Sequence, residues 1–126
     1  MIIDTDVLVW YLRGNVHARK VLEKAIPFEI SAVTWAEILQ GMRDKQEIKK
    51  FRALMKSWNT DIIHIDENIC IRALLLIDDF GLSHSVHFAD ALIAATAIEN
   101  QLPLLTGNTK YYRCIPVLEL KAFHSN

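Results

Sequence analysis

The chain contains little of what marks several large classes of protein. Its 126 residues include two cysteines, Cys70 and Cys114, which lie far apart and lack CxxC spacing, so we interpret both as buried small apolar residues. The N-terminus has no basic stretch followed by an apolar run, and no window reaches the roughly 18 uncharged apolar residues of a membrane helix. We therefore expect a cytoplasmic protein without a membrane segment.

An excess of charge of one sign is also missing. Lys and Arg number 14 against 15 Asp and Glu, so no global positive field draws the chain to nucleic acid or anionic lipid. Hydrophobic residues make up 52% and charged residues 23%, which argues against a disordered chain, a collagen-like repeat or a coiled coil. The length fits one compact domain, residues 1–126.

Short apolar runs alternate with helical patterns along the chain. The runs predict strands at residues 2–3, 28–31, 61–65, 102–106 and 116–120. Helices are predicted at residues 7–12, 17–25, 34–42, 46–58, 68–80 and 88–99, the fifth of them ending at Gly81. This alternation predicts an α/β fold: a mostly parallel central sheet of about five short strands with helices on both faces.

Two acidic residues lie where the first strand ends. Asp4 closes that strand and Asp6 follows two residues later, at the start of a helix. In parallel sheets ligands collect outside the carboxyl ends of the strands, and the turn formed by residues 106–108 falls at the same edge. The alternative for both acids is helix capping.

Glu37 and Asp90 are two further candidates. Residues 34–37 have the S/T-x-x-E form of a capping box, in which Glu37 would only bond back to the cap. Asp90 begins an alanine-rich helix that has no Lys or Arg between residues 88 and 101, and a buried charge must be paired or bound to a metal. Its alternative role is to complement the helix dipole. Oxygen ligands of this kind suit Mg²⁺ or Mn²⁺, which promote phosphodiester hydrolysis.

Four segments, in order, resemble the PIN domain, in particular the VapC-type toxin ribonucleases of toxin-antitoxin pairs. The segments are residues 3–8, residues 34–38 with Gly41, residues 89–97 and residues 105–108. The resemblance implies a three-layer α/β/α sandwich and a metal-dependent endoribonuclease that hydrolyses RNA phosphodiester bonds with Mg²⁺ or Mn²⁺. It implies that the catalytic, metal-binding acids are Asp4, Glu37 and Asp90.

Other positions of the resemblance are supporting ones. Thr5 and Thr106 are expected to orient the site, and Asp6 and Asn108 to reach the metal through water. Asn108 stands where the family often has a fourth acid, so the sequence leaves one or two metal ions open.

The resemblance also implies partners. Such toxins are commonly homodimers neutralised by a small VapB-like antitoxin, whose end lies in an apolar groove. Candidate groove residues are Trp10, Tyr11, Leu12, Trp35 and Leu39, with core packing as the alternative.

RNA requires local positive charge. Residues 43–56 carry six basic residues against two acidic ones, and a solvated helix face is the alternative explanation. The candidate RNA contacts are Arg43, Lys45, Lys49, Lys110 and Arg113.

Two other functions compete with the nuclease, and a zinc site is a further possibility to weigh. Asp4 and Asp6 also resemble the acids of a haloacid-dehalogenase-like phosphatase, which would leave Glu37 without a role. The uncharged Asn108 suits a catalytically weak or inactive PIN-like binding module. His84 and His87 form an H-x-x-H pair, but a zinc site has no third ligand nearby.

Overall fold

Five short strands form one parallel sheet in the order β3-β2-β1-β4-β5. The computed structural model describes all 126 residues. The central strand β1 (Ile2–Ile3) lies between β2 (Glu29–Ser31) and β4 (Leu104–Thr106), and the edges are β3 (Asp61–Ile63) and β5 (Leu120–Ala122). All four pairings are parallel. The predicted α/β class and five-stranded sheet are confirmed.

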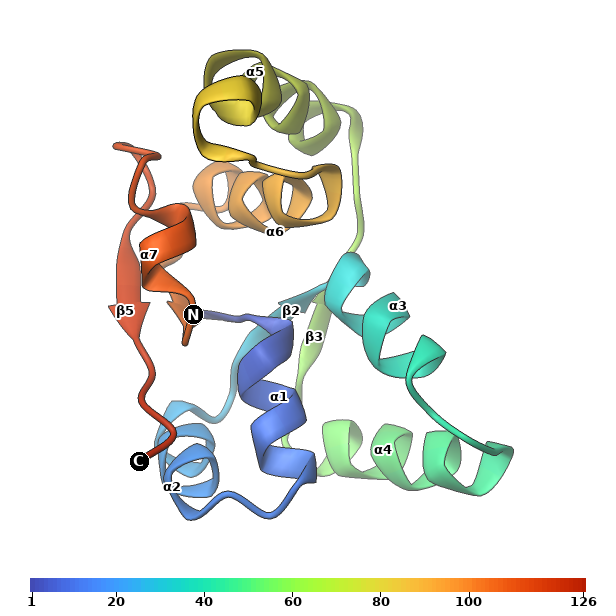
Figure 1. Cartoon of the computed structure of the whole chain (residues 1–126). Helices are drawn as coiled ribbons and strands as arrows, with labels where there is room; N and C mark the ends of the chain where they lie inside the picture. Colours follow the sequence, from blue (N-terminus) through green and yellow to red (C-terminus); the bar gives the residue numbers. More distant parts are fainter.

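Helices cover both faces of this sheet (Figure 1). Seven helices connect the strands, two in each of the first three connections and one in the last: α1 (Thr5–Leu12), α2 (Val16–Ala25), α3 (Ala32–Gln40), α4 (Lys45–Ser57), α5 (Glu67–His84), α6 (Phe88–Glu99) and α7 (Thr109–Tyr112). Helices α5 and α6 pack together on one face, and α1, α2 and α4 lie on the other (Figure 1). The three-layer sandwich implied by the resemblance is therefore present.

The two residues of β1 face opposite layers. Ile2 belongs to the hydrophobic cluster of α5, α6 and α7, whereas Ile3 belongs to the cluster of α1 to α4. Leu104 and Leu105 of β4 divide in the same way, because successive side chains of a strand point to opposite faces. Every residue of β1 and β4 is buried, so even these short strands contribute side chains to both cores.

Helix α5 runs past its predicted end. Gly81 lies inside the helix, which continues to His84 and closes at Ser85 in the left-handed conformation with φ 55°. One glycine costs a helix only about 1 kcal/mol, and the buried side chain of Val86 just after the turn anchors the longer helix in the core. The prediction that Gly81 ends this helix is wrong.

The last strand is also displaced, and two smaller expectations fail. Residues 116–120 were expected to pair, but β5 begins at Leu120, because Leu118 turns into the core instead. The short helix α7 was not predicted. Cys70 and Cys114 are free, as expected, but half-buried rather than buried.

Candidate active site

Asp4 directly follows β1 and is bonded to the neighbouring strand β4. Its backbone N–H donates to the carbonyl oxygen of Leu105 over 2.9 Å, which continues the pairing of β1 with β4. One carboxylate oxygen accepts from the N–H of Thr5 and the other from the hydroxyl of Thr106, each over 2.8 Å. Asp4 therefore does cap α1, as the alternative held, but it is also 4% exposed and tied to β4.

The surroundings of Asp4 disfavour its negative charge. Burial, and next the nearby carboxylate of Asp6, raise the pKa of Asp4 from 3.8 to about 6, against the opposing effect of the hydrogen bonds from Thr106 and Thr5. A buried carboxylate with another acid beside it is stabilised by a cation. The site is thus poised to hold positive charge.

Asp6 has one satisfied oxygen and one without a partner. Oδ2 accepts from the backbone N–H of Gly107 over 2.9 Å, whereas Oδ1 is buried without a hydrogen-bond partner. Burial raises the pKa of this carboxyl as well. A side chain at position 107 would place its Cβ 2.6 Å from Oδ2, so any larger residue would push this carboxylate aside.

Glu37 is not a capping-box residue. Helix α3 begins at Ala32, and its N-cap is Ser31, whose hydroxyl accepts from the N–H of Val33 over 3.1 Å. Thr34 and Glu37 therefore lie inside the helix. Ser31 takes the cap because it is the last residue of β2, where the extended backbone turns into the helix.

Thr5 orients the side chain of Glu37. The Thr5 hydroxyl donates to Glu37 Oε1 over 2.7 Å, and its oxygen lies 3.0 Å from the hydroxyl oxygen of Thr34. Because a threonine carries one hydroxyl proton, the donation to Glu37 leaves Thr34 as donor to Thr5. The chain of hydroxyls aims a carboxylate of α3 at the start of α1.

Asp90 enters from the opposite layer. It lies in the first turn of α6, where a negative charge is favoured, so the dipole alternative also applies. The side chain is half-buried rather than fully buried. The Tyr112 hydroxyl donates to Asp90 Oδ1 over 3.4 Å.

One hollow of about 350 Å³ joins these residues. It is lined by Asp4, Thr5, Asp6, Val9, Trp10, Arg13, Glu37, Asp90 and Asn108. Thr106 lies beneath it, buried and bonded to Asp4. The structure thus brings together all three predicted catalytic acids and their four supporting residues at the carboxyl edge of the sheet.

The donors of this hollow fit a hard divalent cation. No three acids or histidines are close enough to enclose an ion by themselves, but Mg²⁺ usually takes one or two carboxylates and keeps several waters. The unpartnered Oδ1 of Asp6 and the raised pKa of Asp4 are both relieved by positive charge. Water-filled coordination among oxygen ligands matches Mg²⁺ or Mn²⁺ rather than zinc.

Sequence reasoning missed Arg13. It provides the only cation among the residues that line the acidic hollow, and its guanidinium lies 5.8 Å from the ring centre of Trp10. The signal was the spacing of Asp6, Val9, Trp10 and Arg13, which is that of one helix face. In the sequence, a single arginine next to a glycine predicts only the end of a helix.

A second, more apolar hollow of about 570 Å³ lies between α1, α3 and α4. We call it the α1/α4 groove. Its lining is Val9, Leu12, Arg13, Glu37, Ile38, Gly41, Met42, Arg43, Glu47, Lys50, Phe51 and Leu54. Val9, Arg13 and Glu37 also line the acidic hollow. The two hollows therefore adjoin along α1.

The predicted groove residues divide between these environments. Leu12 lines the α1/α4 groove and Trp10, at 37% exposure, the acidic hollow. Tyr11 packs edge-on against Trp58, and Trp35 stacks on Phe51, so both follow the core-packing alternative. Leu39 lines neither hollow.

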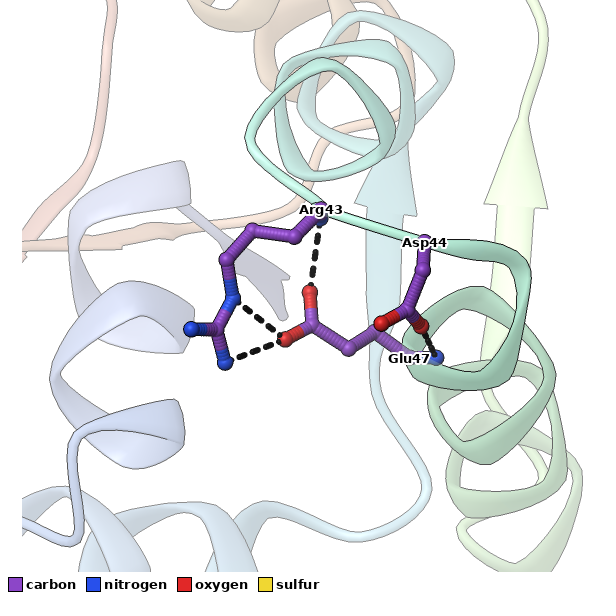
Figure 2. Close-up of polar contacts among 3 residues, drawn as sticks. All are labelled: Arg43, Asp44 and Glu47. Atoms are coloured by element: carbon purple, nitrogen blue, oxygen red, sulfur yellow. Dashed lines mark hydrogen bonds and ion pairs between the residues drawn. The ribbon is translucent and has the colours of Figure 1, made fainter.

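The predicted RNA-contact residues lie outside the acidic hollow. Arg43 is engaged by Glu47: its backbone N–H donates over 2.8 Å and its Nε over 2.9 Å, while Asp44 caps α4 (Figure 2). Exposed cations follow on two helices: Lys45 and Lys49 on α4, and Lys110 and Arg113 at α7.

The histidine pair does not form a metal site. His84 Nδ1 lies 2.7 Å from the Ser83 hydroxyl, His87 is the N-cap of α6, and no group of three candidate ligands surrounds either ring.

The fold and the hollow define a class: a parallel α/β protein with clustered carboxylates at the carboxyl end of its central strand. The sequence profile of the PIN domain matches residues 1–114, and the chain belongs to that family. It is 35% identical over 116 residues to "Ribonuclease VapC10" of Mycobacterium tuberculosis, covering 89% of this chain and 85% of the relative. It is 30% identical to "Ribonuclease VapC" of Rickettsia bellii, covering 95% and 93%.

Solved structures share the fold. A chain of a "Toxin-antitoxin complex from Klebsiella pneumoniae" superposes with TM-score 0.79 at 29% identity, covering 93% of both chains. A chain of VapBC2 from Rickettsia felis, solved with a promoter DNA fragment, superposes with TM-score 0.80 at 23% identity and 98% coverage of both.

Proposed function

We propose that the chain is a metal-dependent endoribonuclease that hydrolyses RNA phosphodiester bonds, and that it is the toxin of a type II toxin-antitoxin pair. The observation that carries the proposal is the single hollow in which Asp4 after β1, Glu37 of α3 and Asp90 of α6 converge. Relatives named as VapC ribonucleases, 30–35% identical over most of the chain, support the same activity.

The acids of the hollow are the proposed metal ligands. Asp4, Glu37 and Asp90 would hold Mg²⁺ or Mn²⁺ in part through bound waters, since no three of the acids are close enough to enclose an ion by themselves. Asp6 and Asn108 would also reach the ion through water. The bound ion supplies a water of lowered pKa and positive charge beside the phosphate. Asn108 brings no charge, which favours one ion over two.

Arg13 is the proposed first contact for RNA. A hollow lined by four carboxylates repels phosphate, and a guanidinium at its wall offers paired donors to a phosphate oxygen. Lys45 and Lys49 of α4, Lys110 and Arg113 beside α7, and Arg43 once it parts from Glu47 would extend the positive track.

The phosphatase alternative fits the geometry poorly. The family model that matches residues 1–114 is that of the PIN domain, which supports the nuclease instead. Asp6, the acid and base of that scheme, has one oxygen on Gly107. The position of Glu37 at the same hollow also has no purpose in it.

Calorimetry with Mn²⁺ tests the metal site without a known RNA target. We expect the parent to bind Mn²⁺ and Glu37→Gln to bind at least tenfold more weakly. Glu67→Gln, at the exposed start of α5, is the control and should match the parent. Parent binding that is unchanged in Glu37→Gln would contradict the shared acid cluster.

Cleavage of mixed RNA separates the enzyme from an inactive binding module. The parent should cut RNA with Mg²⁺ or Mn²⁺ and stop with EDTA, and Asp90→Asn should lose activity while its melting temperature in EDTA stays near that of the parent. Metal binding without any cleavage would favour the inactive module.

We propose that the α1/α4 groove receives an apolar segment of a small VapB-like antitoxin. The groove adjoins the acids, and the structural neighbours include toxin-antitoxin complexes. Leu12→Asp, which places a charge on its wall, should weaken inhibition by the antitoxin and leave metal binding intact.

The expected homodimer stays a prediction. Helix α5 exposes Ile71, Leu74 and Leu75 at helical spacing, and Leu75→Glu should shift a sedimenting dimer to monomer.

None of the helices has both the length and the apolar character needed to cross a membrane. The cytoplasmic location also stays a prediction.

A further inference from the structure

Tyr112 is a buried phenol that reaches the acids from behind. It is the last residue of α7 and only 2% exposed, and its ring packs in the core cluster that contains Ile2 and Leu104 of the central strands. A buried tyrosine usually directs its hydroxyl at a polar partner. Here that partner is a carboxylate of the acidic hollow, because the hydroxyl donates to Asp90 Oδ1 over 3.4 Å.

The same hydroxyl also influences a second acid. It lowers the pKa of Asp4, in opposition to burial. Its hydrogen bond goes to Asp90, and this contact is longer than the usual 2.7–2.8 Å between oxygens. Tyr112 therefore lies behind two acids of the hollow, Asp4 after β1 and Asp90 in α6, which are 86 residues apart in the chain.

The other acids of the site have their own orienting partners. Thr5 holds Glu37, Thr106 holds Asp4, and Gly107 holds Asp6. The orienting partner of Asp90 is a tyrosine. The N-cap residue of α6 makes no side-chain cap, and the side chain of Asp90 accepts its hydrogen bond from Tyr112. The buried phenol thus gives Asp90 a hydrogen-bond donor that is itself fixed by core packing.

We propose that Tyr112 is a positioning residue of the metal site, which holds Asp90 in the orientation that binds the divalent cation. A phenol, with an ordinary pKa near 10, keeps its proton at neutral pH and donates without competing as a ligand. Partners that orient ligating carboxylates typically change metal affinity by about 10- to 100-fold. This inference rests on the proposed metal dependence.

Mn²⁺ calorimetry on Tyr112→Phe tests it, because this change removes one oxygen and keeps the packed ring. We expect at least tenfold weaker Mn²⁺ binding. The control is Tyr11→Phe, the same change at a tyrosine that packs on Trp58 away from the acids; it should bind Mn²⁺ like the parent. The melting temperature in EDTA measures any purely structural cost separately.

RNA cleavage at several Mn²⁺ concentrations gives the second readout. For Tyr112→Phe, raising Mn²⁺ should restore most of the lost kcat, with KM for RNA unchanged. Mn²⁺ affinity within twofold of the parent, or a loss of kcat that Mn²⁺ does not restore, would overturn the positioning role while the nuclease proposal stands. A parent that binds no Mn²⁺ would overturn both.

Discussion

The N–H of Gly107 donates to Asp6 Oδ2 over 2.9 Å, and a Cβ at position 107 would lie 2.6 Å from the same oxygen. The pair joins α1 to the turn after β4 across 101 residues of chain. Residue 107 therefore determines where the Asp6 carboxylate can lie, and with it one wall of the acidic hollow.

Gly107→Ala should destabilise the fold through this contact. The methyl group displaces a half-buried carboxylate and breaks its hydrogen bond, at a cost of about 1–3 kcal/mol in the free energy of unfolding. Urea denaturation measures the loss. In an Asp6→Ala background the same glycine change should cost less, because the clashing oxygen is gone; equal costs in both backgrounds would refute the contact.

Asp4→Asn should stabilise the metal-free protein at neutral pH. Because the pKa of Asp4 is raised in the folded state, from 3.8 to about 6, the folded protein binds this proton more tightly than the unfolded chain. The resulting stability is fully present below pH 3.8 and is lost as the pH rises through about 6. Two pKa units correspond to about 3 kcal/mol as an upper value.

The measurement is urea denaturation in EDTA at pH 4 and pH 7.5. The variant should exceed the parent at pH 7.5 and converge with it at pH 4. Addition of Mn²⁺ at pH 7.5 should then reverse the order, since only the parent retains the charged ligand. A parent that is as stable as the variant at pH 7.5 without metal would show that Asp4 carries no such penalty.

Thr5→Val should weaken Mn²⁺ binding several-fold through Glu37. Valine keeps the shape of threonine but removes the hydroxyl that donates to Glu37 over 2.7 Å. Thr5→Ser retains the hydroxyl and should bind like the parent. Calorimetry on the two variants gives the answer, and a serine variant as weak as valine would assign the effect to packing of the methyl group.

Arg13→Gln should raise KM for RNA and leave Mn²⁺ affinity within about twofold. Loss of one phosphate contact should also reduce the dependence of RNA binding on log salt by about one unit. Arg13→Lys should recover the salt dependence only. The exposed Arg19 of α2 provides the control change, Arg19→Gln; an equal effect there would mean that general charge, not position, governs binding.

Much of the sheet could be predicted because its strands are short, apolar and separated by periodic helices. The convergence of Asp4 and Asp90 also follows from topology, since α6 precedes β4, the direct neighbour of β1. Parallel strands bring their carboxyl ends to one edge, so residues distant in sequence meet there. Most of the site could therefore be predicted once the fold was.

What escaped prediction depends on contacts that local patterns do not record. Ser31 and Thr34 are both plausible caps of α3, and only the end of β2 selects the first. Helix α7 has four residues, too few for a periodic signal, so the approach of Tyr112 to Asp90 was not foreseeable. The exposure of the Asp90 side chain likewise depends on how the neighbouring residues shape the hollow, which the local sequence does not show.

The shared wall of the two hollows has a thermodynamic consequence. Val9, Arg13 and Glu37 border both the acidic hollow and the α1/α4 groove, so a ligand that moves them in one place changes the free energy of binding in the other. Such linkage is reciprocal. If an occupant of the groove lowers the affinity for RNA by some factor, bound RNA lowers the affinity for that occupant by the same factor. Accumulating substrate would then release the toxin from its own inhibitor, without any separate signal.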